Sequence, residues 1–158
     1  MEHYLFDQMA FVRSQTLRAA GAVTEEAADQ IPDGFRNSIR WNLGHIYVVA
    51  ERIYFQYLGL PMRMPEGFRE QFDKGTSPLN QSPSSVPTLA ELTELLSSQE
   101  ERMRQLLSNR MQEQLVPPYT TSLGVTLATP EQFVSFSLFH EGMHLATMKA
   151  YLTLLSRK

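Results

Sequence analysis

Hydrophobic and polar positions follow the period of an α-helix in four long segments of the chain. These segments cover about residues 2–20, 37–58, 88–107 and 129–156. Apolar residues three and four positions apart give the segments faces that can be buried together. The last two segments also begin with a threonine followed three residues later by Glu or Gln, which is a helix-capping pattern. The pattern predicts four helices.

Stretches rich in proline, glycine and serine separate the predicted helices. About thirty residues, 59–87, connect the second helix to the third, and a connection of this length is typical of a lid or a flexible linker. Pro117 and Pro118 open another long connection, in which the residues around Gly124 favour a short hairpin. We predict an all-α fold, an antiparallel four-helix bundle, with residues 1–158 forming one domain. Connections of this length leave the order of the helices open.

The composition excludes several classes of function. A chain of 158 residues is long enough for one domain with its own core. It contains no cysteine, so a metal site would have to use His, Asp or Glu side chains. The 14 basic and 17 acidic residues are interspersed, and they form no polybasic stripe for nucleic acid or anionic lipid. With no apparent signal peptide or membrane span, we expect a soluble, cytoplasmic protein with neither of these partners.

The fourth predicted helix contains the sequence H-E-x-x-H, from His140 to His144. Residues four apart lie on one face of a helix, so both imidazoles can reach one metal ion. A zinc metalloprotease of this type needs a third ligand, usually downstream, and an extended strand that aligns the substrate. The residues after His144 include no Asp, Glu or His, and the chain lacks a strong strand signal. The sequence therefore argues against a zinc protease.

A third metal ligand would have to come from upstream of the H-E-x-x-H sequence. His45 lies in the middle of the second predicted helix, whereas His3 lies in the first turn of the chain, where we expect it to be solvated. Facing helices of a bundle commonly build metal sites, and three nitrogens would leave coordination positions open. Two simpler interpretations stay open. His45 could be a core histidine bonded to a carbonyl, and His140 and His144 could be neutral and hydrogen-bonded.

The fourth predicted helix is apolar on nearly all sides. Glu141 is the only formally charged residue from Gln132 to Met148. Such a helix must be covered on several faces, and a second copy of the chain is the simplest additional cover, so we expect a homodimer. A buried Glu141 needs a partner, and we expect it to orient a histidine N–H or to pair with an arginine such as Arg40 or Arg52. The alternative role is a general base, which makes Glu141 the candidate catalytic residue.

Two stretches resemble a known family. RWNLGHIYVVAER (residues 40–52) and TPEQFVSFSLFHEGMHLATMKAYLTLL (residues 129–155) are similar to the DinB-like family of DNA-damage-inducible, metal-binding bundles. The resemblance implies a four-helix bundle, often dimeric, with a divalent ion, commonly zinc or nickel, held by His45, His140 and His144. The family often continues after the last histidine with Gly-Gln-Ile, where this chain has Leu-Ala-Thr. That difference leaves the three ligands unchanged.

The resemblance also implies chemistry. Characterised relatives include transferases that use low-molecular-weight thiols such as bacillithiol or mycothiol. The sequence thus favours a metalloenzyme that activates a thiol or water, as a thiol S-transferase or a hydrolase of a small-molecule substrate, with a thiol as possible cosubstrate. The alternative is a non-catalytic, metal-stabilised dimer with a binding or stress-response role. Asn42, one helical turn before His45, is the other polar group that spacing places near the site.

Overall fold

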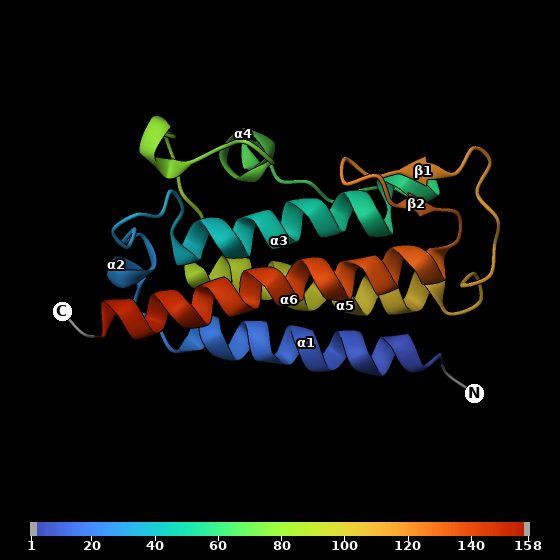
Figure 1. Ribbon diagram of the computed structural model, residues 1–158, viewed down its shortest axis with the longest axis horizontal. Coiled ribbons are helices and arrows are strands. Elements are labelled where there is room, and N and C mark those ends of the chain that lie inside the picture. Colours follow the sequence, from blue (N-terminus) through green and yellow to red (C-terminus); the bar gives the residue numbers. More distant parts are fainter. Residues whose placement is uncertain (1–2, 157–158) are drawn as a thin grey trace.

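The computed structural model describes residues 3–156, and most of them are helical. Four long helices lie side by side along the longest axis of the molecule (Figure 1). They are α1 (Tyr4–Gly21), α3 (Ile39–Tyr54), α5 (Leu89–Leu107) and α6 (Pro130–Leu155). The short elements are α2 (Glu25–Ala28), η1 (Gln56–Leu58), α4 (Phe68–Phe72), η2 (Pro78–Asn80), β1 (Tyr119–Thr120) and β2 (Thr126–Leu127). The predicted helical class is confirmed.

The ends of the helices follow from local capping. Thr88 and Glu91 form the predicted capping box at the start of α5. Thr129 caps α6 through the N–H of Gln132, but the Gln132 side chain accepts from Ala128 N, so the reciprocal half of the second box is absent. The second helix ends at Tyr54, earlier than predicted, because the backbone leaves the helical conformation at the next residue and continues as η1. The predicted start of the first helix at residue 2 lies outside the described residues.

The directions of the four long helices differ from strict alternation. His3 contacts Glu131 and Arg13 contacts Glu141, so α1 and α6 run parallel. Helices α3 and α5 also run in one direction, because the 59–87 connection passes back along the molecule before α5 begins (Figure 1). The prediction of an antiparallel arrangement is therefore corrected for two pairs, α1 with α6 and α3 with α5, whereas α3 and α6 run in opposite directions (Figure 1). The length of the 59–87 connection is what permits the parallel course of α3 and α5.

The 59–87 connection is packed against α3. Phe68 and Phe72 of α4 are buried in the hydrophobic core together with α3 residues. Gly44 permits this contact, because a Cβ atom there would lie 2.4 Å from Cγ of Phe72. The other long connection contains the predicted hairpin, in which Tyr119 and Thr120 pair with Leu127 and Thr126. The 59–87 connection therefore lies along the side of α3, and the hairpin lies near the end of α3 (Figure 1).

The interior consists of two hydrophobic clusters separated by a polar layer at mid-length. One cluster takes in the C-terminal parts of α1 and α6, and the other takes in their N-terminal parts. Between them lie buried polar side chains from all four long helices: Arg13, Thr16, Glu51, Gln99 and Glu141. Buried charges of this kind are costly unless paired, so their partners fix how the helices meet. No helix of the described residues has the length and hydropathy needed to cross a membrane.

Candidate metal centre

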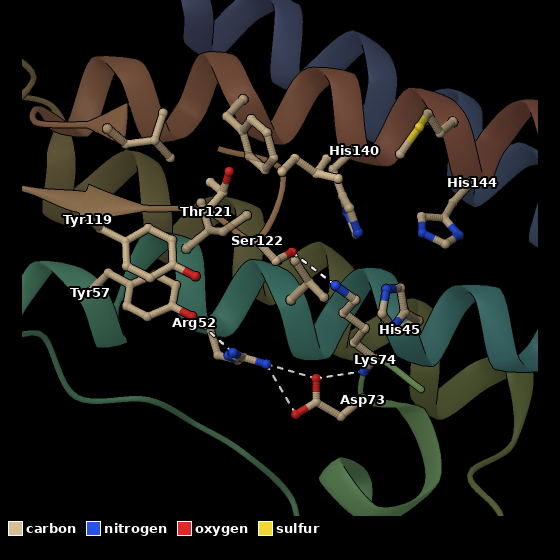
Figure 2. A pocket seen from close by; sticks show the side chains of 16 residues that line it. His45, Arg52, Tyr57, Asp73, Lys74, Tyr119, Thr121, Ser122, His140 and His144 are labelled. Atoms are coloured by element: carbon tan, nitrogen blue, oxygen red, sulfur yellow. Dashed lines mark hydrogen bonds and ion pairs between the residues drawn. The ribbon is translucent and has the colours of Figure 1, made fainter. Parts of the chain in front are cut away.

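The three histidines singled out by the sequence meet on one side of the molecule. His45 comes from α3, and His140 and His144 come from successive turns of α6 (Figure 2). Their potential ligand atoms all lie within 4.8 Å of one another. The ring centroids are 5.3 Å apart for His45 and His140, and 4.8 Å for His45 and His144. The arrangement could bind one metal ion.

Hydrogen bonds fix two of the three rings and their tautomers. Nδ1 of His45 lies 2.6 Å from the carbonyl oxygen of Phe72, which can only accept, so this nitrogen carries the proton. Nδ1 of His144 lies 2.7 Å from Oδ1 of Asn42, whose Nδ2 donates to the Ser38 carbonyl. The Asn42 oxygen must accept from His144 in the same way. In both rings Nε2 is left with a lone pair for an ion.

Neighbouring residues also fix the orientation of the His45 ring. The ring stacks on Trp41 with centroids 4.6 Å apart and an interplanar angle of 11°. Trp41 in turn donates from Nε1 to the hydroxyl of Thr76 at 2.9 Å. The indole and the Phe72 carbonyl therefore hold the imidazole from two directions. His140 makes no hydrogen bond with the described residues, so its ring is held by packing alone.

Burial keeps the imidazoles neutral. It lowers the pKa of His140 to about 4, with a further contribution from His45. Burial, with repulsion from His140 and His45, lowers the pKa of His144 to about 3. The pKa of His45 is lowered as well, again mainly by burial. Neutral imidazole is the form that binds a metal ion, so the three side chains are in the metal-binding form at neutral pH.

A cavity of about 290 Å³ extends from the histidines to the β-hairpin (Figure 2). Its far end is formed by Tyr57 and Tyr119, whose rings stack with centroids 3.9 Å apart. The charged side chains along it are Arg52, Asp73 and Lys74. This volume is near the lower end of the roughly 300–1,000 Å³ common for ligand pockets. It suits a small molecule.

Glu141 faces away from this cavity. Its carboxylate accepts from Nε and Nη2 of Arg13, both at 2.9 Å, and from the Thr16 hydroxyl at 2.8 Å. The expectation that Glu141 pairs with an arginine is confirmed, but the arginine is Arg13 and neither Arg40 nor Arg52. Glu141 touches no histidine N–H, because one step along the helix turns it by about 100° from His140 toward α1. Asn42 has the role of orienting a histidine instead.

The two arginines expected near Glu141 have other partners. Arg40 donates to Asp29 and Glu25 and ties α2 to the start of α3. Arg52 donates to Asp73 and to the Tyr57 hydroxyl beside the cavity. His3 is also different from expectation. It is half-buried, caps α1, and its Nε2 lies 3.2 Å from a carboxylate oxygen of Glu131. His3 lies at the start of α1, away from the other three histidines, and does not belong to their group.

Several residues that line the cavity could not be predicted from the sequence. Tyr57, Asp73, Lys74, Tyr119 and Ser122 lie in short elements or connections, where no helical period indicates which way a side chain points. The one available signal was the length of the 59–87 connection, which suggested a covering segment. Its actual contribution is more specific, since it supplies a carbonyl to His45 and two charged residues to the cavity.

Comparisons with known proteins concern the family and the fold of the chain. The model of the DinB superfamily matches residues 8–148 of the chain. Among solved structures, a conserved protein from Enterococcus faecalis is similar in fold, with a TM-score of 0.75 and 14% sequence identity. The match covers 100% of this chain and 99% of the other. No curated protein shows significant similarity in sequence.

Proposed function

Since the chain belongs to the DinB superfamily, we propose that it is a metal-dependent enzyme whose ion is held by His45, His140 and His144. One observation supports this proposal above the others. Three neutral imidazoles converge at the end of a cavity, and hydrogen bonds on Nδ1 leave Nε2 of two of them available. Zinc and nickel suit such ligands. When bound, the ion would lower the pKa of a coordinated thiol or water and supply a nucleophile at neutral pH.

The chain's own residues define what this chemistry would act on. The cavity beside the histidines has a volume of about 290 Å³, which suits a small molecule. We therefore propose a thiol S-transferase-like reaction or the hydrolysis of a small substrate, with a low-molecular-weight thiol as cosubstrate in the first case. No peptidase activity is expected, because Glu141 is bonded to Arg13 and Thr16 and does not line the cavity. The H-E-x-x-H sequence thus supplies two ligands and a structural carboxylate.

A non-catalytic role is the second candidate. Each histidine comes from α3 or α6, so an ion would tie these two helices together and stabilise the folded state by binding it selectively. The cavity favours the enzyme, since a purely structural ion needs no space beside it. Both candidate functions use the same metal ion. In the enzyme the open coordination positions would bind a reactant, whereas in the structural role they would have no function.

We further propose that the protein forms a homodimer through the outer face of α6. This face exposes Phe139 and Leu154, at 54% and 39% of their surface, and Met143, which is 44% exposed and also lines the cavity, lies at its edge. Small residues lie between them, namely Gly142, Ala146 and Ala150. A second copy of the same helix would cover these apolar groups, and the small residues would let the two backbones approach.

The proposed metal site is tested by elemental analysis of protein purified without chelators. We expect about one divalent ion per chain, and a large loss of metal in His45→Ala, His140→Ala or His144→Ala, because two nitrogens hold an ion poorly. His3→Ala is the matched control, since His3 is outside the group. Full occupancy in His45→Ala would remove the third ligand from the proposal.

A further inference from the structure

Lys74 brings a positive charge to the cavity that no carboxylate in the described part of the chain pairs with. Its Nζ donates to the Ser122 hydroxyl at 2.9 Å. Figure 2 shows its side chain directed into the cavity, with the amino group between Ser122 and His45. An ammonium group has three donors, so two of them are left for a ligand.

The other charges in the cavity cancel. Nη1 of Arg52 donates to both carboxylate oxygens of Asp73, at 2.8 and 3.1 Å, and Nη2 donates to the Tyr57 hydroxyl at 2.9 Å. Asp73 also accepts from the backbone N–H of Lys74. Arg52 and Asp73 thus form a neutral pair, and the net charge of the charged lining residues is that of the Lys74 ammonium.

The rest of the cavity is largely apolar. The uncharged lining residues include Val49, Ile53, Leu123, Leu127, Phe136 and Met143. Lys74 and Ser122 are exposed at the mouth, where they join the 59–87 connection to the hairpin. A ligand that fits must therefore combine a hydrocarbon body with one anionic group.

We propose that the cavity binds a small organic acid, with its carboxylate against Lys74 and Ser122 and its apolar body against the apolar walls. This inference rests on the proposed function, because the histidine end is where the reaction would take place. A carboxylate fits better than a phosphate. Phosphate sites commonly use a bidentate arginine or several backbone N–H groups, whereas here the Arg52 fork is occupied by Asp73. One ammonium and one hydroxyl match a monoanion.

The inference is tested with cobalt(II)-loaded protein, whose visible spectrum reports a thiol binding to the ion. The probes are ω-mercapto acids from mercaptoacetate to mercaptohexanoate, each compared with the amide of the same length. We expect one length of acid to bind about 3- to 10-fold more tightly than its amide, as for a partly exposed charge-assisted hydrogen bond. The preference should decrease at high salt, because the charge lies at the mouth of the cavity.

Variants identify the source of the preference. Lys74→Met should abolish it, while Lys74→Arg should retain it. Lys149→Met removes the same charge from the exposed surface of α6 and should change nothing. Equal binding of acid and amide by the wild type, or a preference that persists in Lys74→Met, would overturn the inference and leave the metal site intact. Failure of every thiol to change the cobalt spectrum would instead overturn the proposed function, and the inference with it.

Discussion

The carbonyl oxygen of Phe72 lies 2.6 Å from Nδ1 of His45, so the connection between α3 and α5 directly holds a ring of the candidate metal centre. The contact depends on close packing of α4 against α3. Gly44 lies on α3 one residue before His45, and the ring of Phe72 occupies the space that a side chain at position 44 would need. Packing, backbone geometry and ring orientation are therefore coupled at this point.

We predict that Gly44→Ala damages both stability and metal binding. The new Cβ would lie 2.4 Å from the Phe72 ring, so α4 must shift and the bond to His45 must lengthen. We expect a loss of about 1–3 kcal/mol in the free energy of unfolding and a roughly 10- to 100-fold weaker metal affinity. Chemical denaturation and metal titration measure the two effects.

Gly21→Ala is the control for this prediction. Gly21 is also helical, but a Cβ there meets nothing within 4 Å. This variant should bind metal like the wild type. Equal metal affinity in Gly44→Ala and Gly21→Ala would show that the Phe72 contact does not govern the orientation of His45.

The second prediction concerns the pH dependence of the metal-free protein. In the folded state the pKa of His140 is lowered to about 4 and that of His144 to about 3, whereas unfolded histidines titrate near 6.5. Between these values the unfolded state binds more protons. The stability of the folded state is therefore complete above about pH 6.5 and decreases as the pH falls toward 4, by up to about 1.4 kcal/mol per pH unit for each group.

Urea denaturation at several pH values, with a chelator present, measures this dependence. His140→Gln and His144→Asn should each make the profile flatter between about pH 6.5 and 4, because the group that titrates is removed. If neither cavity variant changes the slope, burial of the two imidazoles does not control the acid stability of the protein.

The sequence allowed the site to be predicted better than the arrangement of the helices. His140 and His144 are four residues apart on a strongly periodic segment, so their common face follows from helix geometry. The directions of α3 and α5 depend instead on how the 59–87 connection folds, and its prolines and glycines leave many paths open. Lys74 and Tyr119 could not be assigned to the cavity for the same reason, because irregular backbone has no period.

Glu141 illustrates a different limit. Its burial was predictable, because an isolated charge on an apolar helix must lie in the interior. Its partner was not, since the choice among arginines depends on which helix packs against that face. Helices α1 and α6 run parallel and bring Arg13 to the level of Glu141, whereas Arg40 and Arg52 lie beside other carboxylates.

The third prediction follows from that buried pair. Replacing Arg13 by Met leaves the Glu141 carboxylate buried with only the Thr16 hydroxyl, and we expect it to cost about 3–5 kcal/mol. Glu141→Gln, which is nearly isosteric, should cost less than Glu141→Ala. The double variant Arg13→Met/Glu141→Leu should be more stable than the sum of the single effects indicates, because it leaves no unpaired charge. Denaturation of the wild type, Arg13→Met, Glu141→Leu and the double variant measures the coupling.

The same variants separate a structural carboxylate from a protease base. Glu141→Gln should keep its metal, and neither it nor the wild type should cleave peptides, because the carboxylate is bonded to α1 and does not line the cavity. Unstructured peptides with and without chelator provide the assay. Chelator-sensitive cleavage by the wild type that disappears in Glu141→Gln at unchanged metal content would restore the protease interpretation.

The last prediction concerns the outer face of α6. Phe139 is 54% exposed there, and a charge at this position would be tolerated in a monomer but would be buried in the proposed dimer. We therefore expect light scattering to give the mass of a dimer for the wild type and of a monomer for Phe139→Glu, with metal content unchanged. Phe11→Glu on α1, where the phenylalanine is 65% exposed, is the matched control and should stay dimeric. A wild type that is monomeric at all concentrations, or a dimer broken only by Phe11→Glu, would exclude α6 as the interface and leave its small residues without this role.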